Sequence, residues 1–342
     1  MRVDDVFIRA TGLRLPDFLP LDEALGKATG MVSVAYSPDE SAAEMGAAAA
    51  TTAMERSGTG PDDLDLILHA DTYHQGQDLW PVASYIQREA AGGSTCPALE
   101  IRQMSNGGMA ALDLGIAYLT SQPHRRDALL TTADRFCPPG IDRWHTDPGT
   151  PYADGATALV LSRRGGYAAL RSLAMLADAE LEPLHRGDEP FTPAPLSHRV
   201  PVDFEAAKRA FTGKVGMSYT ITRANAGQRT VIKQALAEAD MELSEADWVL
   251  LPHFGLRRLR AIYHRQYGID PARTTWEFSR TVGHLGAGDQ FAGLDHLVVS
   301  GLARPGQRVV LIGVGAGYSW GCAVVEILAR PDWAAAGTGT DR

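Results

Sequence analysis

Cysteines are scarce in this sequence, and their spacing excludes two kinds of cross-linked protein. Only three occur among the 342 residues, namely Cys96, Cys137 and Cys322, and no two of them form a Cys-x-x-Cys pair. A disulfide framework or a structural zinc site needs closer and more regular pairs. We therefore expect a protein of a reducing compartment that holds no metal and no resident cofactor.

A membrane-spanning run and a basic leader are also missing. No apolar stretch comes near the roughly 20 residues that a membrane-spanning helix needs. The segment Met1–Ile8 is acidic and strand-like, without the basic flank and the apolar run of a signal peptide. These absences favour a cytoplasmic protein.

Positive charge is in short supply. The chain has 32 Lys and Arg against 41 Asp and Glu, a formal net charge of -9, so its surface as a whole repels nucleic acids and acidic membranes. Any basic docking site must therefore be local. Apolar residues, in contrast, make up 45% of the chain, enough for a large core in two domains or in two halves of one.

An internal duplication is visible in the sequence. Short apolar runs with a polar entry, typical of buried parallel strands, occur in the same order in both halves. Residues 63–69 return as 245–253, residues 128–132 as 308–312, and residues 154–162 as 320–328. Apolar positions with helical spacing lie between them, at residues 40–57, 105–121, 204–212, 223–239, 256–267 and 287–302.

These elements predict two mixed α/β halves, residues 1–170 and residues 171–330. Five prolines between residues 180 and 202 predict a surface loop where the halves join. The length of this loop suits either a cap over a pocket or a plain connector. We expect a disordered tail at residues 331–342.

Three segments resemble motifs of one enzyme family and occur in the order in which that family has them. Tyr152–Ala156 is similar to its Phe-Gly-Asp-Gly-Ala, Leu251–His253 to its Val-Pro-His, and Gly315–Gly321 to its Gly-Gly-Gly-Phe-Thr-Trp-Gly turn. The chain thus resembles the ketoacyl-ACP synthase III branch of the thiolase superfamily, from about Phe7 to Leu328. The resemblance implies a thiolase fold, in which two duplicated mixed-sheet α/β halves form an αβαβα arrangement, and it implies a homodimer.

The chain departs from this family at the catalytic residues. Where the family has its nucleophilic cysteine, in Ala-Cys-Ala-Gly, this chain has Met104–Gly107, which puts Ser105 at the start of a predicted helix. Where the family has Gly-Asn-Thr-Ser-Ala-Ala, it has Gly283–Gly288, which puts His284 in place of the asparagine. This pattern looks like the offshoots of the family in aromatic polyketide and decorated antibiotic pathways.

The substituted residues suit one another chemically. A serine hydroxyl does not ionise near neutral pH, so a base within hydrogen-bond reach must take its proton during attack. His284 supplies that base, and Asp289 in the same loop supplies a carboxylate that orients the ring. We therefore predict a catalytic triad of Ser105, His284 and Asp289. The structural alternatives are a serine helix cap, a turn histidine bonded to backbone, and an aspartate cap of the following helix.

The resemblance implies further groups in the site. It implies that the Nε2–H group of His253, the family's second histidine, points at the thioester carbonyl; a hydrogen-bonded histidine at a strand end is the alternative. It also implies an oxyanion hole made by the backbone N–H groups of Ser105 and Ala316. Trp80 falls where the family's dimer partner inserts an aromatic residue into the acyl pocket, or else it is a core tryptophan.

A local cluster of cations predicts a docking site for an acyl carrier protein. The cluster comprises Arg257, Arg258, Arg260, Arg265 and Lys214. In the family this region receives the acidic helix and the phosphate of the carrier; a solvated helix face is the alternative. Residues 28–36 lack the Trp and Arg with which the family grips coenzyme A. We therefore favour a carrier protein over coenzyme A as donor, with an acyl thioester on phosphopantetheine as substrate.

Three functions fit these predictions. The first is acyl transfer, in which Ser105 takes an acyl group from a thioester and passes it to a second carrier thiol or to a hydroxyl of a sugar or polyketide. The second is starter-unit condensation with malonyl-carrier protein, with His253 and His284 as donors to the malonyl thioester. Because a His284 held as base by Asp289 is less free to donate, transfer is preferred. The third is a carrier-binding scaffold without catalysis.

Overall fold

One mixed sheet of nine strands runs through the molecule, and the computed structural model describes residues 1–335. The strands at its two edges are parallel to their neighbours, and those near its middle are antiparallel. In sheet order the strands are β5 (Ala98–Ile101), β4 (Leu64–Ala70), β6 (Asp127–Asp134), β7 (Gly155–Ser162), β1 (Phe7–Arg14), β8 (Ala168–Ala177), β11 (Ser319–Ile327), β10 (Arg308–Gly315) and β9 (Trp248–Leu250).

The sheet consists of two equivalent halves. Strands β1 and β8 join them through only two residue pairs, Phe7 with Ala169 and Ile8 with Ala168. From this join the first half runs outward as β1, β7, β6, β4, and the second runs outward as β8, β11, β10, β9. The strands predicted as repeats thus occupy equivalent places, and the duplication is confirmed. The boundary predicted at residues 170 and 171 falls inside β8, and the division into two domains stays a prediction.

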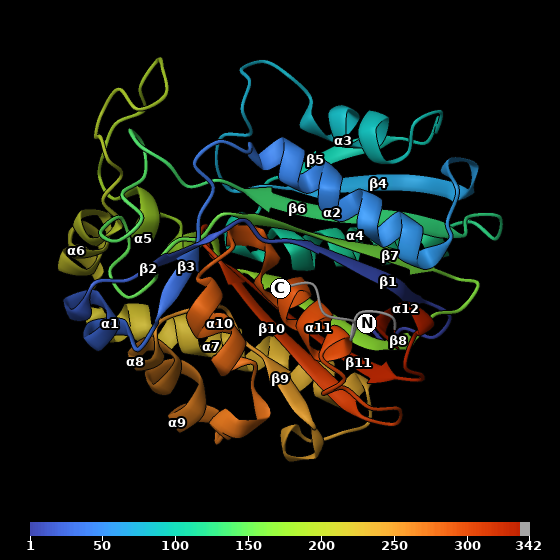
Figure 1. Ribbon diagram of the computed structural model, residues 1–342. Coiled ribbons are helices and arrows are strands. Elements are labelled where there is room, and N and C mark those ends of the chain that lie inside the picture. The colour runs from blue at the N-terminus through green and yellow to red at the C-terminus, as the bar shows by residue number, and fades with distance from the viewer. Residues whose placement is uncertain (336–342) are drawn as a thin grey trace.

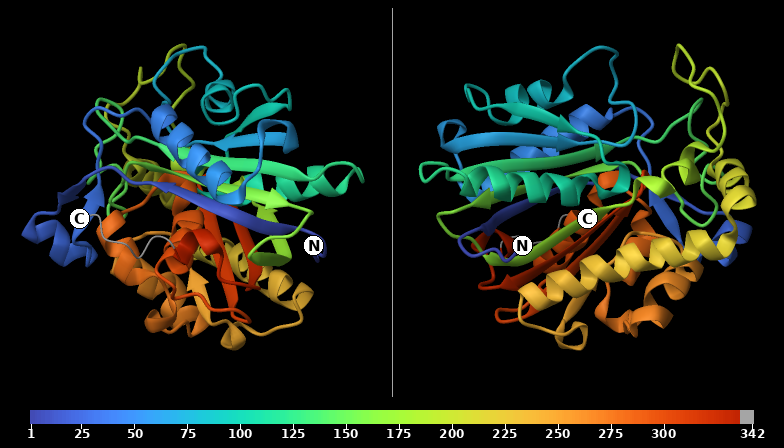
Figure 2. Two further views of the ribbon diagram at one scale, coloured as in Figure 1. Left: turned by 45° about the vertical axis from the view of Figure 1, so that its right-hand side comes forward. Right: turned by 180° about the vertical axis from the view of Figure 1, so that it is seen from behind.

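Helices form three layers around the two half-sheets (Figures 1 and 2). Helix α2 (Ala42–Ser57) covers the outer face of β1, β6 and β7, and helix α7 (Met217–Glu238) covers the outer face of β8 and β11. Helices α4 (Gly107–Thr120) and α11 (Asp289–Val299) lie between the half-sheets and contact strands of both. The predicted αβαβα arrangement is therefore confirmed.

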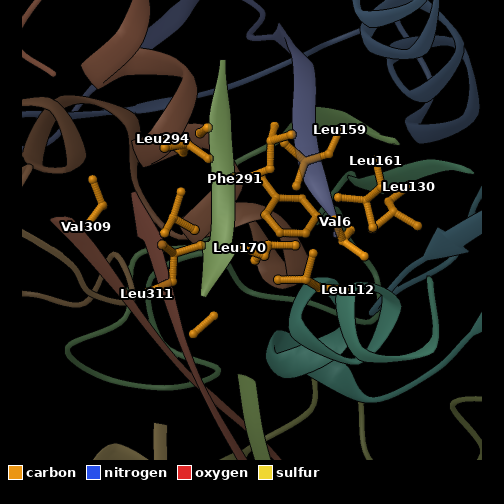
Figure 3. Packing of buried hydrophobic residues seen from close by; sticks show 14 of the residues in the cluster. Val6, Leu112, Leu130, Leu159, Leu161, Leu170, Phe291, Leu294, Val309 and Leu311 are labelled. Carbon is orange, nitrogen blue, oxygen red and sulfur yellow. The ribbon is translucent and has the colours of Figure 1, made fainter. Parts of the chain in front are cut away.

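The two middle helices are fixed by an apolar core. Figure 3 shows Phe291 of α11 among side chains from the half-sheets and from α4, including Leu112, Leu130 and Leu170. All four side chains are almost fully buried. Truncating such a phenylalanine to alanine costs about 3–5 kcal/mol of stability because the cavity does not collapse fully. This packing sets the positions of the amino-terminal ends of α4 and α11, where the predicted triad lies.

The remaining elements cover the rims of the sheet. They are β2 (Phe18–Pro20), β3 (Ser33–Ala35), α1 (Glu23–Thr29), α3 (Val82–Ala90), α5 (Pro183–Arg186), α6 (Phe204–Val215), α8 (Leu256–Leu259), α9 (Arg265–Tyr267), α10 (Trp276–Val282) and α12 (Asp332–Ala335). All six predicted helical stretches are helical for most of their length, and a π-helical turn at Arg260–His264 connects α8 to α9. Within the described residues no helix is both long and apolar enough to cross a membrane.

Two predictions for irregular segments need correction. The proline-rich segment at 180–202 is not entirely loop, because it contains α5, although it is irregular from Gly187 onward. The tail is ordered up to Ala335, because Trp333 of α12 packs edge-on against Tyr167 at 5.7 Å between ring centroids. The rest of the predicted disordered tail, residues 336–342, lies outside the described residues.

Candidate active site

Ser105 lies in a tight turn between strand β5 and helix α4. The turn, Met104–Asn106, is a single 3-10 turn, and Met104 adopts a left-handed conformation with φ of +50°. Such a conformation costs about 1 kcal/mol or more in a residue with a side chain, so the surroundings must hold the turn in place. Gly108 lets a second loop approach, since a Cβ atom there would lie 2.5 Å from the carbonyl oxygen of Ala287.

That second loop brings the predicted triad together. The Oγ atom of Ser105 lies 2.8 Å from Nε2 of His284, and Nδ1 of His284 lies 2.6 Å from Oδ2 of Asp289. Because a carboxylate only accepts, Nδ1 of His284 carries the hydrogen, and Nε2 presents a lone pair to the serine hydroxyl. This tautomer is the one that a general base for Ser105 requires.

The structural alternatives for these residues do not match the contacts. Helix α4 has Asn106 at its amino-terminal cap position without a side-chain cap bond, so the Ser105 hydroxyl does not serve as the cap. The ring nitrogens of His284 bond to side chains rather than to backbone. Asp289 is the first residue of α11, but its carboxylate accepts from residues that precede the helix.

The carboxylate of Asp289 is buried and fully engaged. His284 and Asp289 are 2% and 1% exposed, whereas Ser105 is half-buried. Besides the His284 ring, Asp289 accepts the backbone N–H of His253 at 2.7 Å and that of Leu285 at 2.8 Å. Burial alone would raise the pKa of Asp289, but the neighbouring His253 and His284, through their rings and through the hydrogen bonds from the His284 ring and the His253 N–H, hold it below its ordinary value. The carboxylate therefore stays ionised and can stabilise a protonated His284.

The backbone of the His284 loop is clamped by the segment at 151–153. The N–H of His284 donates to the carbonyl of Pro151 at 2.9 Å, and its carbonyl accepts from the N–H of Ala153 at 2.8 Å. Next to this clamp, the buried Asp154 accepts from the guanidinium of Arg143. Sequence reasoning did not assign these positions a role, although the motif Tyr152–Ala156 was the signal that could have identified them.

The second histidine departs from its prediction. His253 lies just after β9, and its Nδ1 is 2.9 Å from the carbonyl oxygen of Gly283. A carbonyl only accepts, so the hydrogen of the neutral ring is on Nδ1 and not on Nε2, where the sequence analysis had placed it. Burial lowers the pKa of His253 and favours this neutral form. The alternative of a fully bonded histidine does not hold either, because Nε2 has no partner among residues 1–335.

Ala316 lies in the turn between β10 and β11, beside the turn that carries Ser105. The two turns touch at Gly315, where a Cβ atom would lie 2.6 Å from the carbonyl oxygen of Gln103 and 2.7 Å from the amide nitrogen of Asn106. Only glycine permits this approach. The predicted oxyanion-hole residues, Ser105 and Ala316, thus belong to adjoining turns.

Three of the predicted docking arginines border one pocket. Arg257, Arg260 and Arg265 line a cavity of about 520 Å³ together with Lys27, which the sequence analysis missed. No salt bridge engages any of these four cations within residues 1–335. The pocket is therefore strongly cationic in an acidic protein, a property that suits a phosphate-bearing ligand. Lys27 directly precedes the segment 28–36, which the sequence analysis compared with the family's coenzyme A-binding segment. Its position in the sequence could therefore have identified it.

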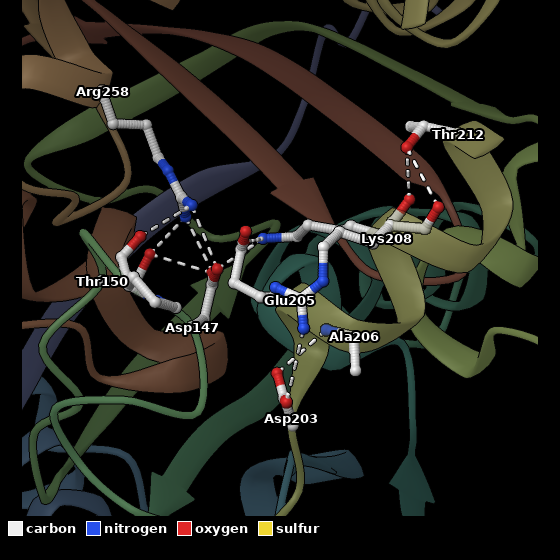
Figure 4. A network of polar contacts seen from close by, with 10 residues as sticks. Asp147, Thr150, Asp203, Glu205, Ala206, Lys208, Thr212 and Arg258 are labelled. Atoms are coloured by element: carbon white, nitrogen blue, oxygen red, sulfur yellow. Dashed lines mark hydrogen bonds and ion pairs between the residues drawn. The ribbon is translucent and has the colours of Figure 1, made fainter. Parts of the chain in front are cut away.

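Arg258 does not belong to this docking group. Figure 4 shows its guanidinium turned toward Asp147, with nitrogen–oxygen distances of 2.8 and 3.0 Å, and toward Thr150. Lys208 contacts the same carboxylate at 2.5 Å. Burial would raise the pKa of Asp147, but these two cations hold it well below its ordinary value. Arg258 thus has a structural role, because leaving Asp147 with one cation would be costly.

The last two predicted positions lie on the periphery. Lys214 pairs with Asp188 on the surface and is 63% exposed, so it stays available to a partner. Trp80 is half-buried and packs against the apolar side chains that α2 and α3 bury between them and the sheet. The centroid of its ring lies 5.4 Å from that of the Tyr85 ring. The part of Trp80 in an acyl pocket stays a prediction.

Comparisons with known proteins agree with this architecture. Residues 236–327 match the family described as 3-oxoacyl-[acyl-carrier-protein] synthase III C terminal. The β-ketoacyl-[acyl-carrier-protein] synthase III of Escherichia coli K12 is 28% identical over 296 residues, which cover 84% of this chain and 85% of that protein. The synthase of Acaryochloris marina is 28% identical over 316 residues, or 89% of each chain.

Solved structures extend the similarity. The acyltransferase ChlB3 is 35% identical, with a TM-score of 0.90 over 96% of this chain and 99% of ChlB3. The 3-oxoacyl-[acyl-carrier-protein] synthase III of Aquifex aeolicus shares the fold, with a TM-score of 0.75 at 20% identity over 94% of this chain and 99% of that one. This chain therefore belongs to the ketoacyl-ACP synthase III-like family of the thiolase superfamily, a family of acyl-transferring and condensing enzymes.

Proposed function

We propose that this protein is an acyltransferase of secondary metabolism that works through an ester on Ser105. The observation that carries the proposal is the unbroken contact from the Ser105 hydroxyl through the His284 ring to the Asp289 carboxylate. A nucleophile, a base and an orienting carboxylate in this order are the parts that acyl transfer to serine needs. The likeness to ChlB3, described as an acyltransferase, supports the same reaction class.

In the first half-reaction the enzyme takes the acyl group from its donor. Oγ of Ser105 attacks the thioester carbon while Nε2 of His284 takes the hydroxyl proton, and the imidazolium is stabilised by Asp289. The backbone N–H groups of Ser105 and Ala316 stabilise the negative charge on the carbonyl oxygen. The carbon–sulfur bond then breaks, and His284 gives its proton to the departing thiol.

In the second half-reaction the same residues work in reverse. The acceptor, a second carrier thiol or a hydroxyl of a sugar or polyketide, gives its proton to His284 as it attacks the acyl-serine. The ester bond to Oγ breaks, and His284 returns the proton to Ser105. The net reaction exchanges one acyl bond for another and needs no metal, oxidant or reductant.

An acyl carrier protein is the proposed donor. The cationic pocket formed by Lys27, Arg257, Arg260 and Arg265 suits the phosphate of a phosphopantetheine arm and the acidic surface of a carrier. The related synthases of Escherichia coli and Acaryochloris marina are named for acyl carrier proteins, which supports the same donor here. Coenzyme A carries the same arm and is the alternative donor.

We also propose a homodimer. Strand β5 is an edge strand, so one side of its backbone is unpaired within the sheet, and Leu99 on it is 53% exposed. An apolar edge strand left in water is prone to pair with another strand. Sedimentation analysis should give the mass of two chains, and a Leu99→Lys variant should dissociate. A monomer at micromolar concentration would contradict this part of the proposal.

Decarboxylative condensation is the second candidate, because the synthases named above are condensing enzymes by name. One experiment separates the candidates, including a scaffold without catalysis. The protein is incubated with an acyl-carrier protein, and its intact mass is recorded. One sample then receives malonyl-carrier protein, and a second receives an acyl acceptor, either a carrier thiol or a hydroxyl compound. Transfer predicts an acyl adduct that passes to the acceptor without carbon dioxide. A ketoacyl product with carbon dioxide would establish condensation, and the absence of any adduct would leave the scaffold.

A further inference from the structure

His253 has a nitrogen that the proposed mechanism does not use. Its imidazole is 1% exposed, and Nε2 has no hydrogen-bond partner among residues 1–335. A buried polar atom without a partner costs about 1–3 kcal/mol, so its persistence in a catalytic site points to a ligand group that bonds there.

The other ring nitrogen fixes what Nε2 can do. Nδ1 faces two oxygens that only accept, the carbonyl of Gly283 at 2.9 Å and Oδ1 of Asp289 at 3.5 Å. Nδ1 must therefore carry the hydrogen. In a neutral ring the remaining nitrogen, Nε2, then has a lone pair and accepts hydrogen bonds.

The charges around the ring favour this neutral state. Burial is the largest effect and lowers the pKa of His253, and His284 lowers it further. Asp289 and the Gly283 carbonyl act to raise this pKa, but the net shift is downward. His296, on α11, faces the same region and adds no negative charge. The aromatic ring of Phe278 lies edge-on to the His253 ring, with 5.9 Å between the ring centroids, and carries no charge that would stabilise a protonated His253. A second proton on His253 would also oppose the proton that His284 takes during acyl transfer.

One carboxylate orients both histidines. His253 and His284 each turn Nδ1 toward Asp289, at 3.5 and 2.6 Å, so each points Nε2 away from that carboxylate. The Nε2 atom of His284 meets Ser105 at 2.8 Å. Two imidazoles thus present lone pairs. The one on His284 is used by the nucleophile, and the one on His253 has no partner in the part of the chain that the structure describes.

We propose that His253 binds substrate as a hydrogen-bond acceptor, so that the site takes an N–H or O–H group at Nε2 and cannot stabilise the enolate of a malonyl thioester. The inference rests on the proposed function and narrows it. Decarboxylation leaves negative charge on the thioester oxygen, which needs hydrogen-bond donors. Lone pairs on His253 and His284 would repel that oxygen, so the site favours transfer over condensation.

The chemistry of the substrates identifies the bonding group. The thioester carbonyl and sulfur are acceptors and cannot bond to a lone pair. The hydrogen donors near them are the terminal amide N–H of the pantetheine arm and the hydrogen of the acyl acceptor. Both present the same chemistry to His253, and substrate analogues distinguish them.

The first test measures the tautomer directly. Protein with ring-¹⁵N-labelled histidine is examined by NMR at pH 7, and a His253→Gln variant identifies the signals of this ring. The inference predicts an unprotonated-type shift for Nε2 and a protonated-type shift for Nδ1. A hydrogen on Nε2, in either a neutral or a charged ring, would overturn it. Because no acyl transfer is involved, this result is independent of the proposed function.

The second test measures the bond to substrate. His253→Leu should lower kcat/KM for acylation of Ser105, or for transfer to the acceptor, about tenfold, the worth of one hydrogen bond. His253→Gln, whose amide oxygen accepts, should recover part of the loss. If the pantetheine arm supplies the hydrogen, wild type and His253→Leu should acylate at the same rate with a donor whose terminal amide is N-methylated. If the two proteins differ only in the rate of transfer, the acyl acceptor supplies the hydrogen.

Two outcomes would overturn the inference even if Ser105 is acylated normally. One is an unchanged rate for His253→Leu in both half-reactions. The other is release of carbon dioxide from malonyl-carrier protein that depends on His253. Failure of the proposed function looks different, because wild-type protein would then form no adduct on Ser105 with any donor.

Discussion

Replacing Asp289 by asparagine tests the triad with a change of one atom. Asparagine would keep the acceptor for the Leu285 N–H, now 2.8 Å from Oδ1, but would place an NH₂ group where Oδ2 now meets the His284 ring and the His253 N–H. Donors would then face donors. With the NH₂ group in that place, His284 relieves the conflict by moving its hydrogen to Nε2, and in that tautomer it cannot take the proton of Ser105. The opposite amide orientation would set the NH₂ group against the Leu285 N–H instead, and it would still remove the negative charge that stabilises a protonated His284.

The expected loss follows from that tautomer change. Acylation of Ser105 should slow about 10,000-fold, the size of effect that the wrong histidine tautomer has in serine hydrolases, or roughly 5.5 kcal/mol in the barrier. The folded state should lose about 1–3 kcal/mol for the His253 N–H left without an acceptor. Thermal unfolding therefore has to accompany the rate measurement, so that inactivity is not mistaken for unfolding.

The assay is single-turnover acylation, followed by rapid quenching and intact-protein mass. Asp295→Asn is the matched control, because Asp295 is also a buried carboxylate of α11, bonded to Thr11 and Arg56 at 2.7 Å, but lies outside the site. It should lose stability and keep its acylation rate. A folded Asp289→Asn protein that acylates within tenfold of wild type would refute the reasoning.

Three further predictions concern the nucleophile, the Arg258 pair and a buried acid. Ser105→Cys should still form an acyl adduct, now a thioester, because a thiol near His284 is a competent nucleophile; loss of acylation by mass analysis would argue against a nucleophile at this position. Arg258→Met should lower the free energy of unfolding by about 3 kcal/mol in urea titrations, since it leaves Asp147 buried with only Lys208; an unchanged midpoint would contradict the structural role. Burial raises the pKa of Asp134 to about 7, so its stabilising protonated form is complete near pH 4 and is lost as pH rises through 7. Asp134→Asn should therefore be nearly neutral at pH 4 and stabilising by up to roughly 4 kcal/mol at pH 8; equal effects at both pH values would be the contrary result.

The periodicity of apolar residues predicted most of the strands and helices and their duplication, whereas the layered arrangement was an implication of the resemblance to the thiolase superfamily. Buried parallel strands such as β4 and β9 need apolar side chains on both faces, and this leaves a continuous apolar run that is easily recognised. The short helices α5 and α12 were missed because their few residues show no period. Trp333 is ordered by a tertiary contact with Tyr167, which no local pattern reveals.

The site was predictable in composition but not in its hydrogen-bond directions. Ser105 and His284 were located by their places in the family's motifs, and Asp289 was added by its chemical fit to them; the structure brings the three within contact of one another. The tautomer of His253 depends on the carbonyl of Gly283, 30 residues away, so sequence could not supply it. Likewise, the direction of Arg258 is set by Asp147, which precedes it by 111 residues.

The location of the acyl group is the most direct test of the central claim that Ser105 is the nucleophile. Protein treated with an acyl-carrier protein is quenched in acid, digested, and mapped by tandem mass spectrometry. The acyl group should lie on Ser105, within the peptide that holds Gln103–Gly108, and Ser105→Ala should remove it. An adduct on Cys96 or Cys137, or one that survives in Ser105→Ala, would contradict the claim.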